Sequence, residues 1–527
     1  MHQKEKCMRK RMDVVLVLLL AISTLVFAQG GKESTTKSAG PTKIEMWYTA
    51  TQTEVGPLPD DWVGYQILKD KFNIELEASS LPSSTTDQDM KIQAAAAADM
   101  LPDFFVANRE VWLRLANNGM LADVTDLYDK MPNRTKIMFD KDAIAFTTLN
   151  GRSYGFATPA MISRNEGLLI RKDWLDRLGL AVPKTTEELV NVMRAFTFND
   201  PDGNGKNDTW GYGAFIEVTT YEAYPGRRFQ PLMGAFGVEG TWDMTAANFG
   251  LQIHKPEFYD FMKFMKSIID EGLIDPNWMA YKKDDFRAAW KQGKFGIMRE
   301  QNAAYAAKNN YSPFDANFPD GEWSIIDPPV GPTGKSSVGP ETRGLRIWCI
   351  SAKAAEEGKA EKIAEMFEWM ASGEGYFLCG WGQEGVNYTL QDGIPVTVPG
   401  DLGFEGPVGQ TYIQLRNIAF NYSSDTELIS RYPVYTTDVS KKQMSALWAL
   451  REMQSKKWTN SMGADSMPVP STDLKTFYEQ GLAEFFTGKR ALTAENWKSF
   501  VAEFDKIGGT AWEKAGLEYA KANSYLK

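Results

Sequence analysis

Short apolar runs alternate with helix-length segments along this chain, and this alternation constrains its fold more than any other feature. Residues 44–48, 74–78 and 104–107 are apolar runs of strand length, and residues 62–72 and 87–98, which lie between them, have helical apolar spacing. Strands that alternate with helices favour a mostly parallel α/β sheet, because a parallel connection needs a crossover that is usually a helix. Ligand sites in such sheets lie in loops at the carboxyl ends of the strands.

The same alternation continues further along the chain. Residues 166–170 form a strand-like run, and residues 172–178 follow as a helix that Gly179 closes. Thr185 and Glu188 form a capping box, which predicts the start of a helix that runs to residue 196. Further helices are predicted at residues 256–271, 283–292, 359–371, 440–456, 473–487 and 494–508, and residues 295–298 are strand-like.

The first residues indicate export. Five Lys and Arg side chains precede an apolar run at residues 14–27, which is too short to span a bilayer comfortably. We interpret residues 1–28 as a signal peptide cleaved after Ala28, with an uncleaved anchor as the alternative, and residues 29–42 as a flexible tether. The residues directly after Ala28 are Gln29, Gly30 and Gly31, so the cysteine that lipid attachment needs is missing from the cleavage point and no lipid attachment is expected there. The sequence therefore predicts a soluble periplasmic protein whose mature chain does not insert into a membrane.

Composition narrows the function classes. The chain has a formal net charge of −10, and residues 1–28 hold five Lys and Arg against two Asp and Glu, so the mature chain is more acidic still. An acidic protein is a poor partner for nucleic acid, because phosphates repel it. About 500 residues are enough for two or more domains with substantial cores. Cys349 and Cys379, the only cysteines after residue 28, permit at most one disulfide, and the run around Cys349 is expected to be core.

Residues 200–208 resemble the first part of a calcium loop. Oxygen-bearing side chains stand at positions one, three, five and nine, a glycine stands at position six, and position seven would give its carbonyl. The metal-ligand candidates are Asp200, Asp202, Asn204, Lys206 and Asp208. Position twelve is Gly211 instead of the usual bidentate Glu, so the motif is incomplete. We favour a structural calcium site, and a solvated Asp/Gly turn is the alternative.

Histidine-based chemistry is nearly excluded by composition. His254 is the only histidine after residue 28, and it stands before Lys255-Pro256 at a helix start, where a surface or capping role is expected. With a single histidine in that position, histidine-based catalytic triads and histidine-rich metal sites are nearly excluded. A glycosidase needs only two carboxylates, so Glu300 and Glu384 keep that alternative open.

Seven segments together resemble one protein family. They are AAAAADMLPDFF at 94–105, NGMLADV at 118–124, NGRSYGFATP at 150–159, LIRKDWLDRLGL at 169–180, EGLIDP at 271–276, WKQGKFGIM at 290–298 and EGVNY at 384–388. Each segment is weak alone, but their order and spacing resemble the extracellular solute-binding proteins of ABC importers (family 1). Among these, the chain is most similar to the larger sugar and oligosaccharide binders. The resemblance covers nearly the whole mature chain.

The resemblance implies an α/β fold of two lobes with a cleft between them, the type II fold of periplasmic binding proteins. By analogy, one lobe comprises residues 43–163 plus 344–385, and the other comprises residues 164–343 plus 386–527. The implied function is capture of a carbohydrate, such as an oligosaccharide, by hinge closure and its delivery to the membrane permease subunits of an ABC importer. A monomer with no catalytic activity and no catalytic cofactor is expected. The alternatives are a secreted glycosidase that uses a carboxylate pair and a structural or adhesive envelope protein.

Sugar recognition needs flat apolar faces and planar polar groups, and loop positions nominate the residues that could supply them. The candidates lie at strand ends, near the expected crossovers and in the Gly/Pro-broken segment after residue 220: Trp47, Thr49, Gln52, Asn108, Arg109, Trp112, Arg164, Tyr221, Tyr224, Arg227, Trp242, Arg299, Glu300, Asn302, Arg343, Trp381 and Glu384. If several of these arginines converge, an acidic sugar such as a uronide is favoured, because Arg pairs bidentately with carboxylates. For Arg227 and Arg228, a solvated surface pair is the alternative.

Overall fold

Two β-sheets organise the fold, and each has its own hydrophobic core. The computed structural model describes residues 40–50, 55–137, 141–158, 164–218, 222–341, 346–419, 425–460 and 464–526. Residues 42–527 form one compact unit. The predicted signal peptide and residues 29–39 of the predicted tether lie outside the described residues.

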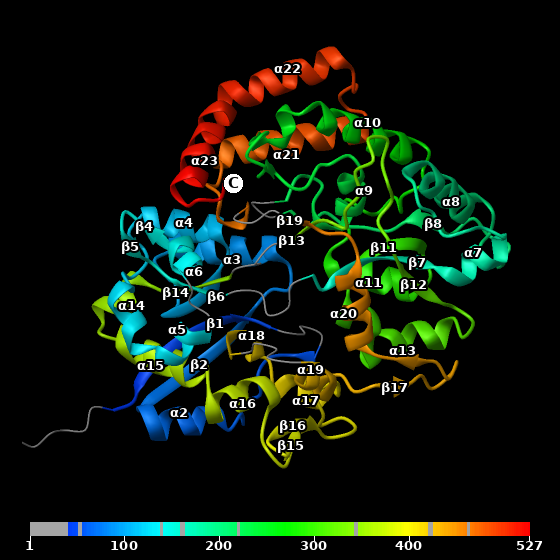
Figure 1. Cartoon of the computed structure of the whole chain (residues 1–527). Helices are drawn as coiled ribbons and strands as arrows, with labels where there is room; N and C mark the ends of the chain where they lie inside the picture. The colour runs from blue at the N-terminus through cyan, green and yellow to red at the C-terminus, as the bar shows by residue number, and fades with distance from the viewer. Residues whose placement is uncertain are drawn as a thin grey trace, which may run out of the picture. The chain divides into compact units, whose positions relative to one another are not determined.

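The first sheet has the strand order β2-β1-β3-β14-β6. β1 pairs in parallel with β2 and β3, and helices α2 and α3 make the crossovers that this pairing needs. β14 pairs antiparallel with β3 and β6, so the predicted parallel pairing holds for the first three strands only. Figure 1 shows α2 beside β2, with α15 nearby. The bounds are β1 (Thr42–Thr49), α2 (Gly64–Phe72), β2 (Ile74–Leu81), α3 (Thr85–Ala97), β3 (Phe104–Ala107), β6 (Phe156–Thr158), β14 (Arg346–Ile350) and α15 (Ala360–Trp369).

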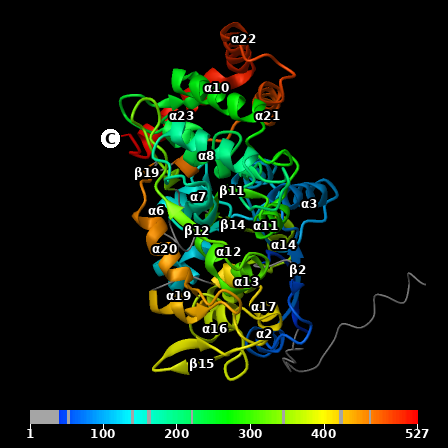
Figure 2. The ribbon, with the colours of Figure 1, turned by 90° about the vertical axis from the view of Figure 1, so that its right-hand side faces the viewer.

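The second sheet has the strand order β12-β7-β11-β8. β7 lies antiparallel between β12 and β11, and β11 with β8 is the parallel pair. The expectation of a mostly parallel sheet is therefore wrong here, because long excursions through several helices, and not single βαβ crossovers, connect these neighbours. Helix α20 packs against β7 and β12 (Figure 2). The bounds are β7 (Glu166–Arg171), β8 (Trp210–Tyr212), β11 (Phe295–Gln301), β12 (Trp323–Ile326) and α20 (Ala446–Ser455).

Two large hydrophobic clusters define two lobes. The core around the first sheet draws on residues 44–157 and 347–379, together with Leu415 and Ile418. The core around the second sheet draws on residues 168–326 and 464–520. We call these parts the first and second lobes. Each lobe is discontinuous in sequence, because the chain leaves the first core near residue 157 and returns to it near residue 347. The exact lobe boundaries stay a prediction.

Most predicted helices and strands are confirmed, with two corrections at helix ends. β3 (Phe104–Ala107), α7 (Lys172–Leu178) and the Thr185/Glu188 capping box at the start of α8 (Thr186–Phe198) are as predicted. The helix predicted at residues 440–456 begins only at Ala446, because the Ser445 side chain caps it and β18 (Gln443–Met444) precedes it. The helix predicted to run to Gly508 ends as α-helix at Phe504 and continues as the wider turn η6 (Asp505–Gly509).

The remaining elements connect and cover the two sheets. The helices are α4 (Arg109–Asn117), η2 (Thr125–Lys130), α5 (Pro132–Ile137), α6 (Lys141–Phe146), η3 (Arg227–Phe229), α9 (Gln230–Ala235), η4 (Gln252–His254), α10 (Pro256–Asp270), α11 (Lys283–Lys291), α12 (Asn302–Ala306), α13 (Lys308–Asn317), α14 (Ala352–Glu356), α16 (Gly373–Trp381), α17 (Pro407–Tyr412), α18 (Arg416–Ala419), α19 (Asp425–Arg431), η5 (Ala464–Ser466), α21 (Thr472–Thr487), α22 (Ala494–Phe504) and α23 (Thr510–Ala522). The paired short strands are β4 (Thr148–Leu149) with β5 (Arg152–Ser153), β9 (Trp242–Asp243) with β10 (Gly250–Leu251), β13 (Pro340–Glu341) with β19 (Thr459–Asn460), β15 (Tyr388–Gln391) with β16 (Ile394–Thr397), and β17 (Tyr435–Thr436) with β18.

The two cysteines and the lengths of the helices bear on two further predictions. Cys349 and Cys379 are both buried and both free, so the permitted disulfide does not form. Among the described residues, no helix has the length and apolar character needed to cross a bilayer.

Candidate functional site

A cluster of buried charges lies where β7 and β11 meet the 3-10 helix η3. Antiparallel pairing sets Glu300 opposite Gly167 and Gln301 opposite Glu166, so the end of β11 lies beside the start of β7. The turn η3 adds two arginines from a different part of the chain. We call this the charge cluster, and its members are Glu166, Glu217, Glu222, Arg227, Arg228, Arg287, Arg299 and Glu300.

Each guanidinium of the charge cluster has a carboxylate partner. Arg227 bridges Glu222 at 2.7 Å and Glu166 at 3.3 Å, and Arg299 also pairs with Glu166. Arg228 bridges Glu217 at 3.0 Å and Glu300 at 3.1 Å, and Arg287 reaches Glu300 at 3.1 Å. Arg227 and Arg299, two of the arginines whose convergence would favour an acidic sugar, do lie together, but both pair with Glu166 of the same lobe.

The electrostatics of the cluster differ between its carboxylates. Burial alone would raise the pKa of Glu166, but the charges of Arg299 and Arg227 outweigh it and lower the pKa to about 2. Glu300 is also buried, and Arg287 and Arg228 lower its pKa in the same way. Burial raises the pKa of Glu222, and its partner Arg227 does not fully offset that effect. Glu222 is therefore the cluster carboxylate that takes up a proton most readily of the three.

Arg346 is a further arginine beside this cluster. It is the first residue of β14, opposite Thr158 of β6, and it lies just after the segment that connects the second lobe to the first sheet. The residue is exposed to solvent. Desolvation of the guanidinium by the surrounding protein lowers the pKa of Arg346, and the positive charge of Arg227 lowers it further. In the described part of the chain, no carboxylate forms an ion pair with Arg346.

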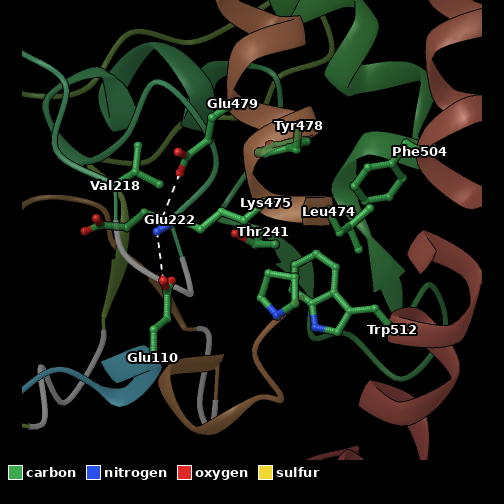
Figure 3. Close-up of a pocket in the computed structure, with 11 residues that line it drawn as sticks. Glu110, Val218, Glu222, Thr241, Leu474, Lys475, Tyr478, Glu479, Phe504 and Trp512 are labelled. Carbon is green, nitrogen blue, oxygen red and sulfur yellow. Dashed lines mark hydrogen bonds and ion pairs between the residues drawn. The ribbon is translucent and has the colours of Figure 1, made fainter. Parts of the chain in front are cut away.

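A pocket next to the cluster is lined by residues of the second lobe and by Glu110 of the first. It encloses about 350 Å³, including space open to solvent, and it is lined by Glu110, Val218, Glu222, Thr241, Pro470, Leu474, Lys475, Tyr478, Glu479, Phe504 and Trp512. Figure 3 shows Lys475 between the carboxylates of Glu110 and Glu479. Glu110 belongs to α4 of the first lobe and Lys475 to α21 of the second, and their Oε2 and Nζ atoms are 2.9 Å apart.

The pocket combines acceptors with aromatic rings. Glu110 and Glu479 offer half-buried carboxylates, and Tyr478 and Trp512 offer half-buried rings on the opposite side (Figure 3). Glu222 and Phe504 also line the pocket, but both are buried. Burial alone would lower the pKa of Lys475, but the Glu110 and Glu479 carboxylates outweigh it and raise that pKa. Carboxylates accept hydrogen bonds from sugar hydroxyls, and rings cover the apolar face of a pyranose. The pocket therefore presents hydrogen-bond acceptors and aromatic rings, the two kinds of group that sugar recognition needs.

A match to a family model identifies the protein class. A model described as bacterial extracellular solute-binding protein matches residues 65–376, which is more than half of the chain. The chain belongs to this family. The family consists of binding proteins and not of enzymes, which agrees with a cleft whose buried carboxylates are held by arginines.

Sequence relatives and solved structures lead to the same class of protein. The polygalacturonan/rhamnogalacturonan-binding protein YtcQ of Bacillus subtilis (strain 168) is 28% identical over 393 residues, covering 71% of this chain and 73% of that protein. Two structures of the S. pneumoniae ABC-transporter substrate-binding protein FusA, one in complex with kestose and one an EF-hand mutant in complex with fructo-nystose, each give a TM-score of 0.67 at 19% identity over 92% of this chain and 99% of that chain. The alginate-binding protein AlgQ2 without calcium ion gives a TM-score of 0.68 at 16% identity, with the same coverage. These likenesses show that this solute-binding protein has the two-lobed periplasmic fold.

Several predicted ligand residues of the solute-binding protein are buried by packing. Trp112, Tyr224, Trp242 and Trp381 are all nearly inaccessible to solvent. Trp112 donates from Nε1 to the carbonyl of Tyr154 at 3.0 Å, and Tyr224 stacks on Phe486. These rings follow strands or glycines in the sequence, but packing partners distant in the sequence cover them.

Other predicted residues make local structural contacts. Asn108 caps α4 and donates to Asp89 at 2.5 Å, and Arg109 donates to the carbonyl of Phe146 at 2.6 Å. Asn302 is buried and donates to the carbonyl of Ala446 at 3.0 Å. The predicted arginine set is therefore not gathered in one place, because Arg109 points into the first lobe.

The rest of the predicted set lies at the surface or outside the described residues. Trp47 and Thr49 are half-buried at the end of β1, and Lys91 lies 4.3 Å above the Trp47 ring. Arg164 and Glu384 are exposed. Gln52, Tyr221 and Arg343 lie outside the described residues. Direct contact between any predicted residue and a ligand stays a prediction.

The predicted calcium loop folds as a hydrogen-bonded turn. The Asp200 carboxylate accepts from the amides of Asn204 at 3.0 Å and Gly205 at 2.9 Å, which lowers the pKa of Asp200. The Asn204 side-chain nitrogen donates to Asp202 at 2.8 Å and to Asp208 at 3.1 Å. An amide N–H thus occupies the space between these carboxylates. In the described parts of the chain, no group of three His, Cys, Asp or Glu side chains is arranged to hold a metal ion.

The departure from the calcium motif at position twelve has a packing reason. A Cβ atom on Gly211 would lie 2.5 Å from Cβ of Met193, so no larger side chain fits there. The hydroxyl of Thr209 donates to the carbonyl of Phe196 at 2.9 Å and points into the fold. Any cation in this loop would therefore be held by Asp200, Asp202, Asp208 and the oxygen of Asn204 after its amide has turned.

Three features of the site were not predicted from the sequence. The loop-position argument did not nominate Lys475, Arg346 or Trp458 as ligand residues. Lys475 stands in a helix and Arg346 in a strand, and Trp458 lies in a loop far from any predicted strand. Trp458 is half-buried, and the Arg299 guanidinium lies 5.9 Å from its ring. The Trp458 neighbour Thr459 begins β19, which pairs with β13 just before the chain enters the first lobe. A signal that could have found Arg346 is its place directly after an expected crossover.

Proposed function

We propose that this protein is the extracytoplasmic receptor of an ABC importer and that it captures an oligosaccharide in the cleft between its lobes. The pocket carries the proposal, since the first lobe contributes Glu110 to it and a ligand that touches Glu110 and the Lys475 side of the pocket contacts both lobes at once. The YtcQ and FusA relatives support a carbohydrate as the ligand. Contacts from both lobes favour the closed state, because a ligand shifts an equilibrium by its differential affinity for the two states.

The glycosidase alternative has no support in this chain. Glu300 is fully buried and held by Arg287 and Arg228, which lower its pKa and remove it from general acid catalysis. Glu384 is exposed in a turn before β15. A retaining or inverting glycosidase needs two carboxyl groups that face one another across a sugar bond. We therefore propose a binding protein without catalytic activity.

The partners of this function are membrane permease subunits that recognise the closed shape. We propose a monomeric, soluble periplasmic protein, released from the segment that precedes residue 29. Family membership supports a location outside the cytoplasm.

We also propose that residues 200–208 hold a structural calcium ion. The three aspartates repel one another, and burial together with neighbouring Asp200 raises the pKa of Asp202. A divalent cation would relieve this repulsion, and the oxygen-rich donor set is the one calcium prefers. The EF-hand mutant of the structurally similar FusA supports the proposal.

The experiment that tests the proposed function is a calorimetric titration against a panel of neutral and acidic oligosaccharides. The sugar that binds is then recovered and analysed by chromatography. We expect saturable binding of one sugar class and recovery of that sugar intact. New reducing ends would contradict the proposal in favour of a glycosidase, and no binding across the panel would favour an envelope protein.

A further inference from the structure

Both ring nitrogens of His254 face carboxylates. Nδ1 lies 2.5 Å from Oε2 of Glu513, and Nε2 lies 2.9 Å from Oδ1 of Asp505. A neutral imidazole has one N–H donor and one acceptor nitrogen, whereas an ionised carboxylate only accepts. Two hydrogen bonds to two carboxylates therefore need the imidazolium, which carries a proton on each nitrogen. We call these three side chains the histidine clasp.

The histidine clasp ties three segments of the second lobe together. His254 ends η4, Asp505 begins η6, and Glu513 lies in the first turn of α23. Between the two carboxylates, Gly508 breaks the helical conformation with a φ of 150°, and Figure 1 shows α23 turning away from α22 there. The amide of Leu251 also donates to Oε2 of Glu513 at 2.9 Å. These contacts with the η4 segment therefore help to fix the direction of α23 after the kink.

Residues next to the clasp line the ligand pocket. Trp512 directly precedes Glu513, Phe504 directly precedes Asp505, and Figure 3 shows both rings at the pocket. The half-buried Trp512 ring packs edge-on against Trp242, with 5.1 Å between the ring centroids. A movement of the start of α23 would therefore move a ring that a sugar in the pocket can contact.

We propose that His254, in its charged form, is a positioning residue that holds the Trp512 wall of the pocket in place. Loss of one proton would leave one carboxylate of the clasp without a donor. Asp505 and Glu513 would then repel each other across a neutral ring, and the start of α23 would loosen. The expected effect on sugar affinity rests on the proposed function, whereas the effect on α23 does not.

The electrostatics of the clasp give the direction of its pH dependence. The hydrogen bond to Glu513 raises the pKa of His254, burial opposes this rise, and Asp505 adds to it. Burial alone would raise the pKa of Glu513, but the hydrogen bond from His254 and the charge of Lys255 help to lower it. Lys255 itself lies 3.9 Å from Asp243. Because the pKa of His254 is raised, the clasp is complete at low pH and is lost as the pH rises through the raised value.

Nuclear magnetic resonance can observe the clasp directly, because His254 is the only histidine after residue 28. The mature protein, prepared without a histidine tag, is titrated while the ¹⁵N shifts of the imidazole are recorded. We expect a proton on both ring nitrogens at about pH 6 and a pKa above that of an exposed histidine, which is about 6.5. Asp505→Asn and Glu513→Gln should each lower this pKa.

Hydrogen exchange measures whether the clasp holds α23. Peptides from residues 505–516 are compared between the wild type and His254→Gln at about pH 6 and about pH 9. A partly exposed ion pair corresponds to a factor of about five, so these peptides should exchange about fivefold faster in the variant at the lower pH and equally at the higher. His254→Arg keeps a charge and donors for both carboxylates, so it should protect α23 at both pH values. Glu518→Gln, which changes an exposed glutamate of the same helix, is the matched control and should exchange like the wild type.

Sugar titrations connect the clasp to the pocket. Kestose and trigalacturonate, a neutral and an acidic trisaccharide, are titrated calorimetrically into the same proteins at the same two pH values. For a sugar that binds, His254→Gln should weaken binding about two- to fivefold at about pH 6 and leave it unchanged at about pH 9. His254→Arg should match the wild type at the lower pH and bind more tightly than it at the higher.

Three results would overturn the proposal. They are a His254 pKa at or below that of an exposed histidine, equal exchange of α23 in the wild type and His254→Gln at about pH 6, and an effect of His254→Gln on affinity that is the same at both pH values, zero included. If no sugar bound, the proposed function would fail, and the resonance and exchange results would decide the clasp on their own.

Discussion

Breaking the ion pair between Lys475 and Glu110 should weaken ligand binding without unfolding either lobe. The Nζ and Oε2 atoms are 2.9 Å apart, and the side chains retain 32% and 14% of their exposure. A second contact between the lobes, from Lys282 to Asp87 at 2.7 Å, is more exposed on both sides. The Lys475 pair is therefore the stronger of the two links.

The size of the effect follows from this exposure. A partly exposed ion pair contributes about 1 kcal/mol, which corresponds to a factor of about five in the ratio of closed to open molecules. Loss of the ion pair by itself can lower the apparent affinity by no more than this factor. Any loss beyond about fivefold in Glu110→Gln would measure the additional loss of the proposed contact between Glu110 and the ligand.

The assay is a double-mutant cycle measured by calorimetric titration with the bound oligosaccharide. Glu110→Gln and Lys475→Met should each weaken binding, and the double variant should be little weaker than either single variant. Glu484→Gln is the control, since it breaks an ion pair with Lys489 at 2.7 Å within the second lobe, and it should leave the affinity unchanged. Additive effects of the two single variants would refute the reasoning, because independent residues give no coupling.

Three further predictions concern the metal loop, a histidine and a ring. Calcium should raise the melting temperature of the wild type and chelator should lower it, and Asp202→Ala should abolish both shifts. A wild-type melting temperature that does not change with calcium would identify the loop as a plain turn. The hydrogen bond to Glu513 raises the pKa of His254, so its contribution of about 1 kcal/mol is present below pH 6.5 and is lost as the pH rises through the raised value. The difference in free energy of unfolding between wild type and His254→Gln should therefore shrink from pH 6 to about pH 9 in urea titrations, and a constant difference would contradict this. Trp458→Ala should weaken sugar binding roughly two- to tenfold in calorimetry if its ring covers a sugar face, with an unchanged affinity as the contrary result.

The fold could be read from the sequence where local patterns dominate. The run FFVA at 104–107 and the Thr185/Glu188 capping box are short-range signals, and both correspond to the observed elements. Strand direction in the second sheet could not be read, because it depends on how β7 meets β11 and β12 over separations of more than a hundred residues. The start of α20 was misplaced because the Ser445 cap lies within a segment of continuous helical spacing.

The candidate site was less accessible to sequence reasoning than the fold. Arg227 and Arg299 were identified from loop position, but their common partner Glu166 was not, since its place opposite Gln301 depends on strand register. Trp112 and Trp242 were nominated because they follow strands or glycines, and tertiary packing buries both. Residue type and loop position predict which side chains could bind a sugar. They do not predict which of those side chains become buried in a hydrophobic core.

Small-angle X-ray scattering with and without the bound oligosaccharide tests the central claim most directly. If the two lobes close around a sugar, the radius of gyration of the mature protein should decrease on saturation, and Glu110→Gln should require more ligand for the same decrease. Tight binding with an unchanged radius of gyration would contradict closure, because it would mean that the ligand occupies a site whose geometry does not depend on the approach of the lobes.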